Sequence, residues 1–250
     1  MKRLMAGGLM LAALLPAAQG QWEKREDASA PVAMVTLSDA SRWQAGLAYA
    51  HVSRTVELDV RESRLQGDVA DVFLGFSVAP WLQLYGQTGV SRARVDDLLN
   101  PRPGAGAGGL LGAKWNLWQF HGDHPEKSWR FTIPLDAQIA HRTTDDKGAG
   151  EIRWTEILVM LPLDYHLTFA HNSRNFYMSE FHSLRLYAGP AFSDIDGTWE
   201  AGDTRRDFEE SESLGAVAGA ELWLLENVSF GARADWFDST TLHVTARYRF

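Results

Sequence analysis

The chain has no cysteine, which excludes disulfide bonds, thiolate metal ligands and a cysteine nucleophile. It also lacks any long apolar run after its first 15 residues. A helical membrane protein is therefore excluded, because one helical span takes about 20 apolar residues. Positive charge is not in excess either: the formal net charge of −8 argues against a general nucleic-acid binder. Tryptophan, in contrast, is abundant with ten residues, and tryptophan collects where an apolar surface meets water.

The first 20 residues have the pattern of an export signal. Lys2 and Arg3 give a positively charged start, and residues 4–15 form a short apolar run. Ala18-Gln19-Gly20 fits the small-x-small pattern of a cleavage site, so we expect a cleavable signal peptide over residues 1–20. An N-terminal membrane anchor is the alternative, but the run is short for spanning a bilayer.

The rest of the chain is expected to form one domain behind a short lead-in. Residues 21–40 are polar and then rich in alanine and proline, without a clear period, which predicts a periplasmic lead-in segment. Residues 41–250 are dominated by the alternation of apolar and polar side chains. A segment of this length suits a single β-barrel.

The clearest alternation is at the end of the sequence, over residues 240–250. Side chains of a strand point to opposite sides in turn, so alternate residues share a face. One face is apolar and ends on aromatic residues: Leu242, Val244, Ala246, Tyr248 and Phe250. The other face is strongly polar: Thr241, His243, Thr245, Arg247 and Arg249. This segment is therefore predicted to be a strand with one apolar and one charged side.

Nine further segments alternate in the same way. The expected strands cover residues 43–51, 69–78, 82–90, 111–117, 129–139, 157–167, 184–192, 214–224 and 228–236. Together with the last strand they make about ten, and single-chain bacterial barrels have an even number of strands. Eight strands remain an alternative, because the connection after residue 167 is long for a periplasmic turn. Ile152 and Trp154 are out of phase with the strand that follows, which indicates a bulge or a protruding loop arm.

Three features predict that the apolar face points outward, toward lipid. Glycines gather on the polar face, as a narrow interior requires, with Gly86 as an exception. Aromatic residues of the apolar face lie near strand ends, which is the girdle pattern of membrane barrels. Charged side chains occupy the polar face, and Arg or Lys facing lipid costs about 2–4 kcal/mol at the midplane. The charges expected in the lumen are Lys114, Arg130, Asp136, Asp164, Arg185, Glu221, Arg233, Asp235 and Arg247.

The export signal, the alternating strands and the Tyr248-Arg249-Phe250 ending together resemble the small bacterial outer-membrane β-barrel superfamily that includes the OmpA transmembrane domain. The resemblance implies an all-β fold, a single antiparallel up-and-down transmembrane barrel, located in the outer membrane. It also implies contact with outer-membrane lipids, and with periplasmic chaperones and the barrel-assembly machinery during biogenesis. In such families the terminal strand is the assembly signal, a role that falls here to Leu242, Val244, Tyr248 and Phe250.

The expected function is therefore a non-enzymatic outer-membrane barrel, structural or narrowly pore-forming. Lumen charges of both signs favour a filled interior over an open channel. The outer loops predicted over residues 54–66, 95–108 and 194–213 would carry any binding to outside partners. Two alternatives stay open: an outer-membrane lipid hydrolase, and a secreted soluble barrel that binds a hydrophobic ligand.

The hydrolase alternative depends on two His-x-Ser stretches. Residues 169–173, with His171 and Ser173, resemble the lipid A deacylases, which use His and Ser two apart on one strand face plus an acid. Glu180 is the nearest acid but is poorly spaced, and this stretch is expected at the periplasmic end. The other stretch, His51-Val52-Ser53, is expected at the outer end, without a clear acidic partner on its face.

Other candidate sites are weaker, and no catalytic, cofactor-binding or metal-binding residue is predicted. Asp145-Asp146 resembles the paired acids of outer-membrane proteases, although a solvated loop is preferred. Met160, His166 and His243 can face the lumen, but their spacing is not that of metal ligands. The glycine-rich residues 104–109 lack the lysine and the helix of a phosphate-binding loop.

Overall fold

The computed structural model describes residues 43–58, 61–96, 104–124, 127–146, 150–169, 181–224 and 227–250, which all belong to one compact unit. The predicted signal peptide and lead-in segment, residues 1–40, lie outside the described residues. In the described part of the chain, no helix is long and apolar enough to cross a membrane.

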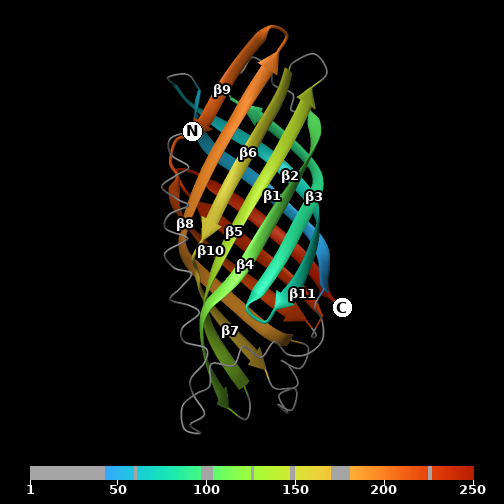
Figure 1. Ribbon diagram of the computed structural model, residues 1–250, viewed down its shortest axis with the longest axis vertical. Coiled ribbons are helices and arrows are strands. Elements are labelled where there is room, and N and C mark those ends of the chain that lie inside the picture. The colour runs from blue at the N-terminus through green and yellow to red at the C-terminus, as the bar shows by residue number, and fades with distance from the viewer. Residues whose placement is uncertain are drawn as a thin grey trace. The chain divides into compact units, whose positions relative to one another are not determined.

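Twelve β-strands build the described part of the chain (Figure 1). They are β1 (Trp43–Leu58), β2 (Arg61–Ala79), β3 (Leu82–Val95), β4 (Ala105–His124), β5 (Lys127–Asp146), β6 (Gly150–Met160), β7 (Leu163–Phe169), β8 (Phe181–Ala201), β9 (Thr204–Glu210), β10 (Leu214–Leu224), β11 (Val228–Trp236) and β12 (Thr240–Arg249).

Ten strand positions around the ring, here called staves, close into an antiparallel barrel; β6 and β7 together fill one of them, and β9 lies outside the ring of ten. Neighbouring strands pair in sequence from β1 to β5, β5 pairs with both β6 and β7, and both of these pair with β8. β8 then pairs with β10, and β12 returns to β1, so the ring has no free edge. β6 and β7 are one stave interrupted at Leu161 and Pro162, because proline has no N–H to give to the ladder. The predicted ten-stranded fold is confirmed.

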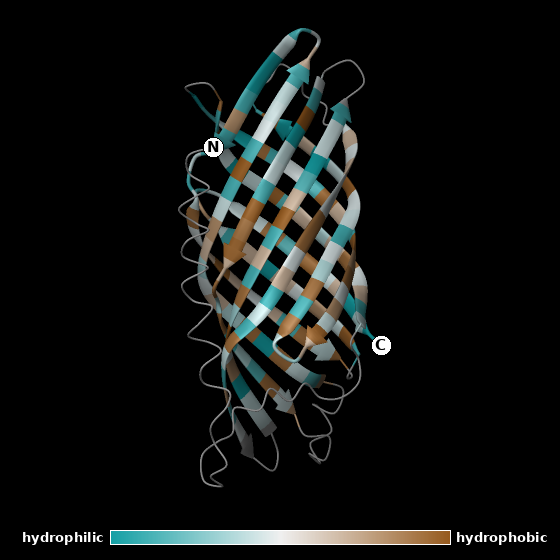
Figure 2. Ribbon diagram, viewed as in Figure 1, coloured by the Kyte–Doolittle hydropathy of each residue, from teal (hydrophilic) through white to brown (hydrophobic). Residues whose placement is uncertain are grey.

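Over most of the barrel the apolar side chains point outward and the polar ones inward. Leu161 and Val244 are 40% and 53% exposed, whereas Asp164 and Asp235 are buried inside. Figure 2 shows the resulting alternation of hydrophobic and hydrophilic residues along each ribbon. This orientation is opposite to that of a soluble barrel around a hydrophobic ligand. The secreted-barrel alternative is therefore wrong for the ten-strand part.

β4 departs from the predicted alternation. Its pairing with β5 shifts register between Asn116 and Trp118, which is a β-bulge. Leu117, the last residue of the expected strand 111–117, is the extra residue, and beyond it Trp118 and Phe120 point outward, 49% and 42% exposed. β4 also runs on to His124, well beyond the expected strand of residues 111–117, and β5 begins at Lys127.

The predicted outer loops are largely strands as well. β1 and β2 pair without a break up to Leu58 and Arg61, so residues 54–58 and 61–66 are paired strand residues. Residues 194–213 form the end of β8 and all of β9. Of residues 95–108, Val95 ends β3 and 105–108 begin β4, with 97–103 outside the described residues. We term this part the cap: residues 54–58, 61–66, 91–96, 104–108, 141–146, 150–156 and 194–210.

β9 closes the cap with fewer staves than the barrel below it. β9 pairs with β8 along one edge and with β1 at Val56, Glu57 and Leu58 along the other. Strands β10, β11 and β12 end below this level. In the cap, β9 alone therefore fills the gap between β8 and β1 that these three strands fill in the barrel. The sheet therefore narrows from ten staves to eight, at the end away from Trp43 and Phe250.

The cap reverses the sidedness of the strands. Its interior is an apolar core of nine buried residues: Val56, Leu58, Leu65, Ala93, Val95, Ile152, Trp154, Ile195 and Phe208. Its outward positions are polar or charged, as at Glu57, Arg64 and Asp194. Outside a bilayer the outer face of a strand meets water, so apolar side chains turn inward. The out-of-phase positions of Ile152 and Trp154 therefore come from a protruding strand arm, one of the two predicted explanations. The other, a bulge, is wrong, because β6 keeps an unbroken register with β5 and β8.

Candidate functional site

The interior of the ten-strand barrel holds a network of ion pairs centred on Arg185 of β8. Arg185 donates to both carboxylate oxygens of Asp164 on β7 at 2.7 and 2.8 Å, and to Glu221 on β10 at 3.1 Å. Lys114 of β4 lies 3.5 Å from Asp164, and Arg247 of β12 lies 3.6 Å from Glu221. These five predicted lumen charges, here termed the central network, join five staves across the interior.

The other four predicted lumen charges fall into separate groups. Asp235 accepts from Arg233 and lies 2.8 Å from His243 Nε2, forming a second cluster on β11 and β12. Asp136 accepts a 2.5 Å hydrogen bond from the Tyr85 hydroxyl. Arg130 donates to Nδ1 of His166 at 2.9 Å, not to a carboxylate.

Several interior charges are not among the predicted lumen residues. Arg142 and Asp71 form a bidentate pair at 2.6 and 3.1 Å, both on positions that the alternation places on the polar face. Arg54 is 1% exposed and lies 3.5 Å from Glu156 and 3.6 Å from Glu210. No signal in the sequence points to Arg54 or Glu210, because both fall in segments predicted as loops.

Arg54 marks the level at which the interior changes from charged to apolar. Its guanidinium lies 4.0 Å from the centroid of the Phe237 ring, and Val56, the next inward residue of β1, belongs to the cap core. Glu210 ends β9 in the cap, and its side chain is fully buried. Burial raises the pKa of the Glu210 carboxyl to about 7, an effect that Arg54 and the Ser193 hydroxyl only partly oppose.

The interior side chains leave space for cavities, of which two lie on either side of the central network. The upper one measures about 110 Å³ and is lined by residues that include Asp71, Arg142 and Arg233. The lower one measures about 140 Å³ and opens beside the β2–β3 turn, at the end where β1 begins. Arg185, Glu221 and Arg247 line both cavities, so the central network separates them. The cap core closes the opposite end of the interior.

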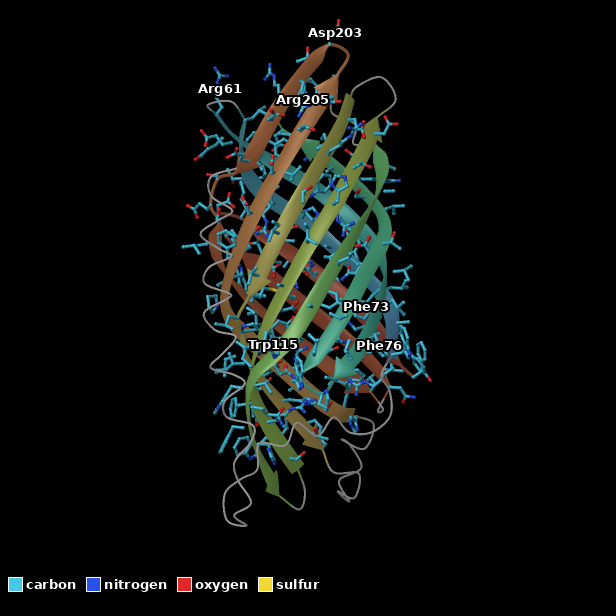
Figure 3. All side chains as sticks on the ribbon, viewed as in Figure 1. Arg61, Phe73, Phe76, Trp115, Asp203 and Arg205 are labelled. Atoms are coloured by element: carbon cyan, nitrogen blue, oxygen red, sulfur yellow. The ribbon has the colours of Figure 1, made fainter. Side chains whose placement is uncertain are left out.

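The outside of the barrel carries aromatic contacts toward the end where β1 begins. A chain of rings crosses β4, β5 and β7 with neighbouring centroids 4.7–6.3 Å apart: Trp118, Phe120, Trp129, Phe131 and Tyr165. Figure 3 labels Phe76 and Trp115 toward this end and Asp203 and Arg205 at the cap. The proposed assembly-signal residues Leu242, Val244, Tyr248 and Phe250 are 48–58% exposed on the same outer surface. Such aromatic belts border the apolar band of membrane barrels.

The hydrolase candidates are placed differently from one another. His171, Ser173 and Glu180 lie outside the described residues. The expectation that His51 lacks an acidic partner is wrong: its Nδ1 lies 3.0 Å from Asp68, the residue opposite it on β2, which also accepts from Tyr49 at 2.6 Å. Among the hydrogen bonds of the described residues, none joins His51 to the Ser53 hydroxyl.

The remaining candidates form no site. Asp145 and Asp146 belong to strand β5, not to a solvated loop. Met160 is buried in a small apolar cluster with Leu158. His166 accepts a hydrogen bond from Arg130, and His243 contacts Asp235, both inside the barrel. Within the described residues, no group of three or more His, Asp or Glu side chains is placed to hold a metal ion.

The sequence matches no model of a known protein family and no curated protein. Among solved structures it is similar to the translocator domain of the autotransporter NalP from Neisseria meningitidis, with 9% identity, a TM-score of 0.32 and coverage of 100% of this chain and 98% of that one. An outer membrane channel from Pseudomonas putida F1 gives 10% identity, a TM-score of 0.36 and coverage of 90% and 100%. The β domain of the Bordetella autotransporter BrkA has 13% identity and a TM-score of 0.32, and the match covers 85% of this chain and 100% of that one. Values this low assign no function to the chain.

The geometry itself defines the class of protein. A closed sheet with an apolar outer surface, aromatic borders and an ion-paired interior satisfies every backbone group without exposing charge to hydrocarbon. The chain is a transmembrane β-barrel.

Proposed function

We propose that this protein is a non-enzymatic β-barrel of the bacterial outer membrane with a sealed interior, structural in role and not pore-forming. One observation carries the proposal: the apolar core of the cap lies above the central network and the Arg54 level, so three successive layers fill the interior. An ion crossing the cap core would lose its hydration without gaining a polar partner.

The placement in the outer membrane is supported by the outward apolar residues. Leu47, Val72 and Leu111 are 57–69% exposed, an arrangement that water would penalise and lipid favours. We assign the cap to the outside of the cell and the end with Trp43 and Phe250 to the periplasm, because the tight β2–β3 turn lies at the latter end. A compact, ion-paired interior also supports a kinship with small barrels such as the OmpA transmembrane domain.

Biogenesis and partners form part of the same proposal. The exposed row of Leu242, Val244, Tyr248 and Phe250 would meet the barrel-assembly machinery, with periplasmic chaperones holding the chain before insertion. The charged outer surface of the cap, and not flexible loops, would meet any outside partner. The β8–β9 hairpin is the part that reaches farthest in Figure 1, with Asp203 at its turn in Figure 3.

Conductance in planar lipid bilayers tests the sealed interior. The wild-type protein is expected to give no discrete conductance steps at applied potentials of either sign up to about 100 mV, where each elementary charge crossing the membrane gains about 2.3 kcal/mol. A matched variant in which residues 196–209 are replaced by a short Gly-Ser turn removes Phe208 and β9 from the cap core, and is expected to leak. Regular steps from the wild-type protein would refute the structural role and favour a narrow pore.

A second candidate function, lipid hydrolysis, is favoured by the His51–Asp68 pair on the outer surface. Asp68 would orient the imidazole, and Ser53, two residues along the same face, would be the nucleophile. The measurement is mass spectrometry of lipid A from cells that carry the wild type or His51→Ala. A change in acyl chains that needs His51 would support the hydrolase, and identical lipid A would remove it.

A further inference from the structure

We propose that the lower cavity, at the periplasmic end of the barrel, binds a small divalent oxyanion of the phosphate type. The cavity measures about 140 Å³, and Pro80 and Trp81 of the β2–β3 turn form part of its wall. The central network closes it from above, so an anion would enter and leave by the same end. This binding site goes beyond a structural role and does not require that the barrel conduct.

The charges that line the cavity do not balance. Its cationic side chains are Lys114, Arg130, Arg185, Arg247 and Arg249. Its carboxylates are Asp164 and Glu221, which leaves three positive charges in excess. The upper cavity is lined by four arginines and three carboxylates, an excess of one. The surplus of positive charge is therefore concentrated in the lower cavity.

Both carboxylates of the lower cavity already have cationic partners. Asp164 pairs with Arg185 and Lys114, and Glu221 pairs with Arg185 and Arg247. Asp164 attracts Arg130 and Glu221 attracts Arg249 only from beyond ion-pair distance, and each carboxylate is shared with its own paired cations.

Of the cations that line the lower cavity, Arg130 and Arg249 have no carboxylate within ion-pair distance among the described residues. Arg130 donates to His166 Nδ1, and the Arg249 guanidinium lies 4.1 Å from the centroid of the Trp223 ring. Asp164 attracts Arg130 beyond ion-pair distance, while burial and the nearby Arg185 and Arg249 disfavour its charge. A desolvated positive charge without a counter-ion is costly, and a bound anion offsets that cost.

The cavity also offers hydrogen-bond donors that have no acceptor. His166 accepts from Arg130 at Nδ1, so a neutral imidazole carries its proton on Nε2. His166 Nε2 and Arg247 Nε are both buried without a hydrogen-bond partner among the described residues. Two guanidinium groups and an N–H match the several acceptor oxygens of a phosphate, which guanidinium groups bind in bidentate geometry. Chloride, with one centre, would satisfy fewer of them.

Isothermal titration calorimetry of the full refolded protein in detergent micelles tests this site. Sodium phosphate is titrated at pH 7.5 against sodium chloride at equal ionic strength. We expect one saturable phosphate site per chain and no comparable heat from chloride. Arg130→Gln and Arg249→Gln should each weaken phosphate binding at least tenfold, and together abolish it. Arg205→Gln, an exposed arginine of the cap, is the matched control and should bind as the wild type does.

Folding of every variant is checked by the mobility shift between unboiled and boiled samples on gels. If Arg130→Gln does not fold, Arg249→Gln decides, since Arg249 lies on the last strand and the described residues give it no ion pair that the change would break. The proposal is overturned if the folded wild type shows no saturable phosphate binding. It is equally overturned if folded variants at Arg130 or Arg249 bind phosphate as tightly as Arg205→Gln.

Discussion

Arg142 and Asp71 lie 71 positions apart in the sequence and form a bidentate ion pair inside the barrel, with N–O distances of 2.6 and 3.1 Å. Their side chains are 8% and 1% exposed, so removing one partner leaves a buried charge. We expect Arg142→Gln to lower the free energy of unfolding by about 3–5 kcal/mol. Urea unfolding in lipid vesicles measures this.

The exposed pair Arg153–Glu151 on β6 is the control for that experiment. Its side chains are 48% and 31% exposed, so Arg153→Gln should change stability by less than about 1 kcal/mol. Equal losses at the two sites would show that the Arg142–Asp71 pair is not desolvated.

Phe208 belongs to the cap core and is only 1% exposed, whereas the larger Trp154 is 3% exposed. Phe208→Ala should cost about 3–5 kcal/mol, and the loss should fall on the cap, because the ten-strand barrel has its own pairing. Limited proteolysis is the measurement: residues 196–209 should be cleaved in the variant while the barrel keeps its heat-dependent gel shift. The outward neighbour Glu209→Ala should remain resistant, and cleavage there would argue against an apolar core.

Glu210 should make the stability of the cap depend on pH. Its pKa rises from an ordinary 4.5 to about 7 on folding, so between these values the folded protein binds more protons than the unfolded one. Stability therefore falls as the pH rises from about 4.5 to 7. Proteolysis of the cap should be slower at pH 5 than at pH 7.5 with an acid-tolerant protease. Glu210→Gln should remove this difference, and Glu209→Gln should keep it; a variant that retains the full pH response would refute the assignment.

Gly112 lies beneath the ring of Tyr85, so an added Cβ would collide with that ring. Gly112→Ala should destabilise the barrel by about 1–3 kcal/mol, as overpacking does. Gly86 faces outward, where an added Cβ would come no closer than 3.4 Å to Leu111, so Gly86→Ala is the matched control. Urea unfolding should separate the two variants, and equal stabilities would mean that Tyr85 does not cover Gly112.

The alternation of side chains predicts the ten staves because its period depends only on backbone geometry and on which solvent each face meets. It fails at two places for physical reasons. The bulge at Leu117 changes the phase without any change in composition. The outer face of the cap meets water, so apolar residues such as Val56 and Leu65 point inward there and polar residues point outward. In the sequence this reversed alternation is out of phase with the barrel strands, and the segments are therefore predicted as loops.

The interior partners are predictable only in part. The inward side of Asp71 and Asp164 follows from their own strands, but which cation each carboxylate meets depends on stagger between staves, and that is fixed by long-range pairing. Arg54 and Glu210 come together only because β9 pairs with β1, a contact between residues about 150 positions apart for which a single sequence carries no local signal.

The reversal of sidedness between barrel and cap is tested most directly by spin labels in lipid vesicles. The chain has no native cysteine, so single cysteines at Val72, Arg64 and Leu65 can each be labelled alone. We predict that a label at 72 collides mainly with oxygen dissolved in lipid, one at 64 with a water-soluble nickel chelate, and one at 65 with neither. A label at 65 as accessible to the nickel chelate as the one at 64 would contradict a dry, apolar cap.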